Sequence, residues 1–214
     1  MVMTADQPFL TYTKGYVSNP APSFIRDGEW LQRSVAERST YMLYPSDWAR
    51  EAFQQECPQF AAKSLTIPWG GNLRLEPAPD QVAGWIAQRS EAPRPTLTFI
   101  GRDWNRKGGD IVSQTVDILR SEGIEIQLNI IGCTPELAPH ESTQVIASLD
   151  KQTPEGWEAF TRIMAASTLL FVPSRAEAYG HVFCEAAAFG IPSASAAVGG
   201  IPSIITHGEN GILL

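Results

Sequence analysis

Two basic side chains stand close together in a glycine-containing loop of this 214-residue chain. The loop follows the apolar run 96–100 and reads Gly101-Arg102-Asp103-Trp104-Asn105-Arg106-Lys107-Gly108-Gly109. Arg102 and Lys107 can converge on one anion there, while the glycines let backbone N–H groups approach it closely. The pattern is neither a Walker A sequence nor a G-x-G-x-x-G fingerprint. The loop therefore favours a diphosphate as its ligand. The alternative is a solvated basic turn that binds nothing.

Two carboxylates form a second group, with Glu177 and Glu185 eight positions apart after the apolar run 168–172. A carboxylate only accepts hydrogen bonds, so it suits sugar hydroxyls, and a bidentate carboxylate can hold a vicinal diol. The backbone N–H groups of Tyr179, Gly180 and His181 stand at the expected start of a helix. There they would offer its positive end to a phosphate.

Glu185 lies among the apolar and small residues 182–184 and 186–188. An unpaired charge is costly to bury there, so Glu185 needs a partner, and we expect a ligand to supply one. The alternatives are a solvated position for Glu185 and an ordinary helix-start carboxylate at Glu177. A glycosidase acid/base pair would need carboxyl groups about 5–9.5 Å apart, whereas eight helical residues span about 12 Å.

A third loop, 197–202, carries Gly199 and Gly200 ahead of a short helix or turn. Its amides could meet the same sugar or phosphate, and a simple tight turn is the equal alternative.

The elements that position these loops alternate along the chain. We expect strands at 39–45, 64–67, 96–100, 126–131, 145–148, 168–172 and 192–196 and a last one at Gly211. Helices are expected at 46–55, 80–88, 108–121, 154–166 and 180–189, with a short helix or turn near 202–206. This alternation predicts an α/β fold, a doubly wound parallel sheet whose ligands bind at the carboxyl ends of its strands.

Proline and glycine positions suggest the domain limits. Residues 1–36 are expected to be poorly organised, because Pro and Gly interrupt every periodicity. Residues 37–93 are expected to be a remnant of an N-terminal domain and a linker, with the boundary at the proline-rich 90–95. Residues 94–214 are expected to form the ligand-binding domain. It should be incomplete, since the chain stops on an apolar strand with nothing to cover it.

Composition limits the class of protein. The net charge of −7 argues against a nucleic-acid partner, which would normally meet a basic face. The three cysteines and three histidines lack disulfide or metal-ligand spacing, so we expect no metal site and a reducing, cytoplasmic compartment. We find neither a signal peptide nor an apolar run near the roughly 20 residues of a membrane span.

The three loops, in this order, resemble the C-terminal domain of GT-B glycosyltransferases of the retaining family 4, often called glycosyl transferases group 1. The segment from Glu177 to Glu185 resembles the family's E-x7-E signature within Pro-Ser-x-x-Glu-x-(Phe/Tyr)-Gly. The segments 44–48 and 67–72 resemble the family's last N-terminal-domain elements and its interdomain crossing. Ser203 departs from the pattern, because many members carry a glutamate after the Gly-Gly-x-Pro turn.

The resemblance implies a role for each of these residues. Arg102 and Lys107, next to Gly101, would bind the donor diphosphate and stabilise the departing nucleoside diphosphate. Glu177 would bind hydroxyls of the donor sugar, and Glu185 would bind the ribose diol. The backbone of 146–149 would lie along the edge of the base. The amides of 179–181 would bind phosphate. Gly199 and Gly200 complete the expected donor-binding residues.

The function we expect is retaining transfer from a UDP- or GDP-sugar to an unknown acceptor, which is a sugar, a lipid or a small molecule. No cofactor is expected beyond the nucleotide-sugar donor itself. Most of the N-terminal acceptor domain is missing and would be supplied elsewhere, so we expect little activity from this chain alone. Two alternatives stay open: a non-catalytic nucleotide-sugar-binding remnant or partial gene product, and a GT-B sugar-nucleotide epimerase.

Overall fold

A computed structural model describes all residues from 1 to 214, and the chain folds into two compact units. The first unit contains residues 1–69 together with 176–180 and 198–204. The second contains 70–175, 181–197 and 205–214. Each unit contains a parallel sheet, so the predicted α/β class with parallel strands is confirmed.

The first unit is built on a three-stranded parallel sheet in the order β1-β2-β3. Its core gathers Ala36, Met42, Tyr44, Ala49, Phe53 and Cys57, and burial raises the pKa of both Tyr44 and Cys57. Its elements are β1 (Val2–Thr4), α1 (Phe9–Tyr16), α2 (Pro22–Arg38), β2 (Tyr41–Tyr44), α3 (Asp47–Glu56), η1 (Pro58–Lys63) and β3 (Ser64–Thr66). Helix α3 corresponds to the predicted helix 46–55, and Ser46 caps it, since its side chain accepts a hydrogen bond from the Ala49 N–H.

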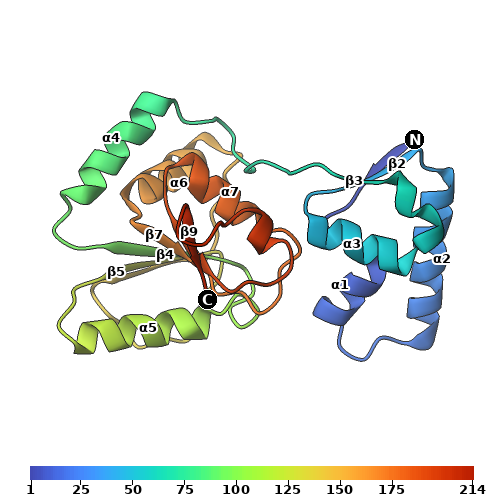
Figure 1. The fold of residues 1–214 in the computed structure, drawn as a ribbon. Helices are drawn as coiled ribbons and strands as arrows, with labels where there is room; N and C mark the ends of the chain where they lie inside the picture. Colours follow the sequence, from blue (N-terminus) through green and yellow to red (C-terminus); the bar gives the residue numbers. More distant parts are fainter. The chain divides into compact units, whose positions relative to one another are not determined.

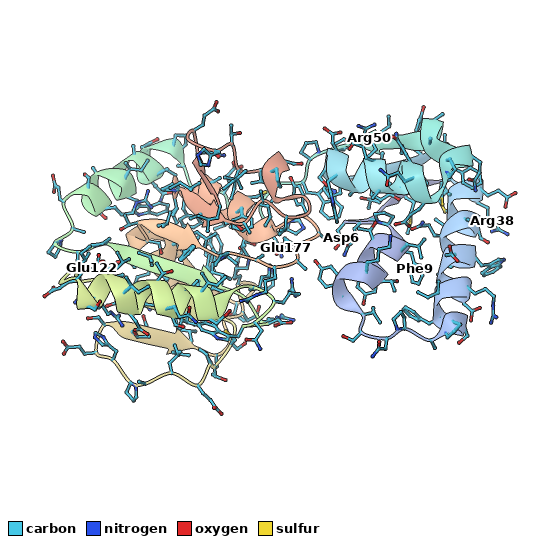
Figure 2. All side chains as sticks on the ribbon, turned by 60° about the horizontal axis from the view of Figure 1, so that its bottom comes forward. Asp6, Phe9, Arg38, Arg50, Glu122 and Glu177 are labelled. Atoms are coloured by element: carbon cyan, nitrogen blue, oxygen red, sulfur yellow. The ribbon has the colours of Figure 1, made fainter.

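The expectation of a poorly organised segment over 1–36 differs from the structure, which has β1, α1 and most of α2 there. The Glu56 carboxylate accepts hydrogen bonds from the backbone N–H groups of Leu10 and Thr11 in the first turn of α1. Pro22 occupies the first turn of α2, where its missing N–H costs nothing. Phe9 points from α1 toward α2 and covers Gly28, where a methyl group would fall 2.0 Å from the ring (Figure 2).

The second unit contains a six-stranded parallel sheet in the order β6-β5-β4-β7-β8-β9. In chain order this is 3-2-1-4-5-6, the strand order of dinucleotide-binding folds, whose switch point lies between β4 and β7. Helix α5 lies on one face of the sheet and α6 and α7 on the other (Figure 1). The elements are α4 (Pro79–Ser90), β4 (Thr96–Ile100), α5 (Gly109–Ser121), β5 (Gln127–Ile131), β6 (Thr143–Ile146), α6 (Pro154–Ala166), β7 (Leu169–Phe171), α7 (His181–Ala188), β8 (Ser193–Ser195), η2 (Ile201–Ser203) and β9 (Gly211–Leu213), with η2 in the first unit.

The division between the units falls after Trp69 rather than at the predicted boundary in 90–95. Helix α4 belongs to the second unit, because Trp85 stacks on Phe189 with ring centroids 5.1 Å apart. Arg89 also donates hydrogen bonds to the carbonyl oxygens of Phe189 and Gly190, just beyond the end of α7. The prolines of 90–95 therefore mark a loop within this unit.

Candidate donor-binding site

The loop after β4 is a tight backbone turn that leads into α5. The N–H groups of Lys107, Gly108 and Gly109 donate to the carbonyl oxygens of Asp103, Asn105 and Trp104, at 3.0, 3.1 and 2.8 Å. Gly108 adopts φ +73°, a left-handed conformation that glycine adopts without strain. The turn thereby fixes the path of the backbone that carries both cations.

The two predicted cations differ in exposure. Lys107 is buried, and its aliphatic stem lies along Gly101, where an added methyl group would fall 2.9 Å from Cγ. Arg102 is exposed. A buried lysine and an exposed arginine can together bind one anion, because the long arginine side chain has several rotamers with which to reach it.

A cavity of about 550 Å³ opens at the carboxyl ends of β4 and β5, within the second unit. It brings together Arg102, Lys107 and Glu185, three of the residues that the sequence singled out, along with Gly101. Residues 147–149 line it too, and they belong to the segment 146–149 whose backbone is expected to lie along the base. The full lining is Ile100, Gly101, Arg102, Arg106, Lys107, Ile131, Gly132, Ala147, Ser148, Leu149, Lys151, Phe160, Val182 and Glu185.

Glu185 is 2% exposed, yet it already has a partner within the chain. The Nζ atom of Lys151 lies 2.5 Å from Oε1 of Glu185. Burial raises the pKa of the Glu185 carboxyl, while the hydrogen bond and charge of Lys151 oppose that rise. The expectation that a ligand would be the partner is therefore corrected, since a lysine fills that place.

Sequence reasoning did not identify Lys151. It lies five residues after the end of β6, in the loop that leads to α6, so its place after a parallel strand was available as a signal. The need of a buried Glu185 for a cation was a second signal. Neither signal told which of the chain's cations would meet Glu185, because 34 residues separate the two partners.

His181 begins α7, and its Nδ1 atom lies 3.1 Å from the carbonyl oxygen of Gly70. The preceding Gly180 has φ +102°, which sets the sharp entry into the helix. His181 is exposed and belongs to the second unit, as the cavity does.

The remaining predicted residues belong to the first unit; they are Glu177, Tyr179, Gly180, Gly199 and Gly200. Two of their loops touch each other: the Gly200 N–H donates to the Ala178 carbonyl at 3.1 Å. At Gly199, with φ +57°, a methyl group would fall 1.7 Å from the Glu177 carbonyl oxygen. Only glycine fits so close an approach, so this Gly-Gly pair serves the packing of the two loops.

Tyr179 is fixed by its side chain. Its hydroxyl donates to the Trp69 carbonyl oxygen at 2.8 Å and accepts from the Trp69 N–H at 3.1 Å. The two aromatic rings meet edge to face, with centroids 5.9 Å apart. The side chain therefore anchors the loop of residues 176–180 to the end of the first segment of the chain.

Comparison with known proteins places this geometry in a family. Residues 94–214 match the family described as Glycosyl transferases group 1. The chain belongs to the group 1 glycosyltransferases. Among curated members, it is 30% identical over 206 residues to D-inositol 3-phosphate glycosyltransferase of Rhodococcus erythropolis, covering 91% of this chain and 46% of that protein. The chain thus spans about half the length of that relative.

A further curated relative and two solved structures are also similar to this chain. Alpha-maltose-1-phosphate synthase of Mycolicibacterium smegmatis is 24% identical over 86% of this chain and 51% of that protein. Sucrose-phosphate synthase of Thermosynechococcus elongatus superposes with TM-score 0.70 at 20% identity, over all of this chain and 54% of the other. Anabaena HepE, in complex with UDP and glucose, superposes with TM-score 0.69 at 17% identity, over 100% of this chain and 57% of the other. The predicted GT-B-like fold is confirmed. None of the helices of this group 1 member has the length and apolar character that crossing a bilayer demands.

Proposed function

We propose that this chain is the donor-binding part of a retaining glycosyltransferase that uses a UDP- or GDP-sugar. The observation that carries the proposal is the shared cavity of Arg102, Lys107 and Glu185 at the carboxyl end of the second unit's sheet. Doubly wound sheets bind their ligands at this end, next to the switch point. A relative solved with UDP and glucose has the same fold. Retention is proposed from the family resemblance.

The chemistry follows from the charges. In a nucleoside diphosphate sugar, the diphosphate becomes more negative as the glycosidic bond breaks. Cations held close to it stabilise that developing charge, which lowers the barrier to departure. We assign this to Arg102 and Lys107, so that transfer needs no metal or other cofactor. The Glu185 carboxylate is assigned to the ribose diol, whose two hydroxyls can donate to it. Glu177 keeps the expected role of binding hydroxyls of the donor sugar.

Calorimetric titration of UDP, GDP and ADP into the whole chain tests the proposal. We expect at least one nucleotide to bind. The substitutions Arg102→Ala and Glu185→Gln should each weaken its binding. Arg162→Ala is the matched control, because Arg162 is exposed on α6 and lines a different cavity. The expected preference for UDP over 2′-deoxy-UDP checks the diol contact, and unchanged binding in EDTA checks the absence of a metal. No binding of any nucleotide, or equal effects of Arg102→Ala and Arg162→Ala, would overturn the proposal.

A further inference from the structure

Lys151 has no part in the donor-site chemistry described so far, yet it is the closest charge to Glu185. Only 21% of its side chain and 3% of that of Glu185 are exposed, so most of this ion pair is shielded from water. Charges removed from water need a partner at close range, and the 2.5 Å contact supplies one. The pair lines the same cavity as Arg102 and Lys107.

Two further contacts hold the ammonium group of Lys151 in place. It donates a hydrogen bond to the Asn72 carbonyl oxygen at 3.1 Å. It also lies over the face of the Phe160 ring, 5.0 Å from the centroid, in a cation–π contact. Lysine is a flexible side chain, and these anchors on two other segments restrict it to a single position beside Glu185.

The Glu185 carboxylate is held from a second side as well. The backbone N–H of Asn72 donates a hydrogen bond to it. The segment around Asn72 lies close to α7, since a methyl group on Gly71 would fall 3.1 Å from the Glu185 backbone nitrogen. Helix α7, the segment 71–72 and the loop before α6 therefore all meet at this carboxylate.

Protonation of Glu185 would change what it can bind. An ionised carboxylate accepts hydrogen bonds at both oxygens, whereas a protonated one has turned one oxygen into a donor. Burial favours the protonated form, and Lys151 is the first opposing influence, ahead of His181 and the Asn72 N–H. The other charged groups lining the cavity are Arg102, Arg106 and Lys107 of the loop after β4.

We propose that Lys151 is a positioning residue that keeps the Glu185 carboxylate ionised and aligned as a diol acceptor in this cavity. This inference rests on the proposed function, in which the diol is the ribose of the donor nucleotide. Lys151 itself need not touch the nucleotide. Its effect on binding passes through Glu185 and therefore depends on pH.

The test compares UDP affinity of the whole chain and of Lys151→Met, Lys151→Gln, Lys151→Arg and Glu185→Gln between pH 6.5 and 9. Without the lysine charge, the Glu185 pKa rises further, so binding weakens as the pH falls and recovers as it rises. Each unit by which that pKa exceeds the pH lowers the ionised fraction about tenfold. The unmodified chain, measured over the same range, corrects for titration of the UDP phosphate itself.

Lys151→Arg is expected to keep the parent's pH profile, because it retains the charge, and Glu185→Gln is expected to bind weakly at every pH. Lys151→Gln keeps a donor without the charge and serves as the second neutral variant. If both neutral variants bind UDP with a pH profile parallel to the parent's, Lys151 has only a structural role and the inference is overturned.

A measurement without nucleotide separates this inference from the proposed function. The carbon-13 resonance of the Glu185 side-chain carboxyl reports its protonation directly. We expect its titration midpoint to lie at higher pH in Lys151→Gln than in the parent, and equal midpoints would overturn the inference. If the midpoint shifts but no nucleotide binds, the control of Glu185 ionisation stands and the proposed function fails.

Discussion

Arg175 and Asp110 form a bidentate ion pair in which both Nη–Oδ distances are 2.7 Å. Arg175 follows β7, and Asp110 lies in the first turn of α5, just after the loop that carries the two cations. The Arg175 guanidinium also donates to the Asn105 carbonyl oxygen. The backbone N–H of Arg175 donates to the Arg106 carbonyl oxygen at 2.8 Å. Arg175 thereby ties together the two loops that follow β4 and β7, on either side of the switch point.

Arg175→Ala is expected to lower nucleotide affinity about fivefold, because the loop bearing Arg102 and Lys107 loses its tie to the loop after β7. The melting temperature should change little, since the pair is exposed and exposed ion pairs add little stability. Arg175→Lys restores the charge but not the two-pronged geometry, so it should recover only part of the affinity. Calorimetry and thermal unfolding measure the two effects, and an undiminished affinity in Arg175→Ala would refute this role.

The Arg175–Asp110 pair also predicts that the effect of Arg175→Ala on nucleotide affinity does not depend on pH near neutrality. The hydrogen bond from Arg175 lowers the pKa of Asp110 below its ordinary value. A carboxylate with a lowered pKa keeps its contribution above its ordinary pKa and loses it only as the pH falls through the lowered value. The affinity ratio of Arg175→Ala to the parent should therefore be constant from about pH 6 to 9. A ratio that drifts across this range would mean that another group titrates with the loop.

Gly108 and Gly123 form a matched pair for the loop after β4. Both have left-handed φ, +73° and +82°. A methyl group at Gly123 meets open space, whereas at Gly108 it would fall 2.1 Å from the Pro173 carbonyl oxygen. Gly123→Ala should cost about 1–2 kcal/mol, the strain of a left-handed alanine. Gly108→Ala should cost more and also lose nucleotide binding, since the loop must move. Equal melting temperatures of the two variants would contradict the close approach at Gly108.

The Lys151–Glu185 pair makes a prediction about stability. Lys151→Met leaves a buried carboxylate without its counter-charge, which should cost about 3–5 kcal/mol at pH 8. An acid whose pKa is raised by folding loses stability as the pH rises above its ordinary pKa, so this cost should shrink toward acid pH. The double variant Lys151→Met/Glu185→Gln removes both charges and should regain most of the loss. Urea unfolding at several pH values measures this, and a pH-independent cost in Lys151→Met would be inconsistent with it.

Helix α4 provides the test of the division after Trp69. Trp85 stacks on Phe189 within the second unit, so Trp85→Ala should destabilise that unit by about 3 kcal/mol, as for other large aromatic truncations. Leu75→Ala is the control, because Leu75 is 63% exposed and its truncation should be nearly neutral. If α4 were only a linker helix, the two variants would unfold at the same urea concentration.

The centre of the second unit's sheet was predictable from the sequence because strands such as β4 and β5 are mostly buried. Such strands read as continuous apolar runs, and the predicted strand 96–100 coincides with β4. The helix 154–166 was also predicted at its observed limits, where Thr153 accepts a hydrogen bond from the Gly156 N–H at 3.1 Å. Local signals of this kind need no knowledge of distant contacts.

The failures all involve distant contacts. Gly28 interrupts a helical pattern in the sequence, but the ring of Phe9 covers it in the fold. Pro93 and Pro95 mark a loop, whereas the packing of Trp85 on Phe189, 104 positions later, decides which unit α4 joins. Glu185 was recognised as needing a partner, but its cation comes from 34 residues away. Residue types thus predicted the need for a contact better than the identity of the partner.

The donor-site proposal is tested most directly by a crystal structure of this chain with bound UDP. We predict that the diphosphate lies against Arg102 and Lys107, and that the ribose hydroxyls donate to Glu185 while Lys151 stays beside that carboxylate. The uracil should lie along residues 147–149. Density for UDP in another cavity, or in this one with its ribose turned away from Glu185, would contradict the assignment.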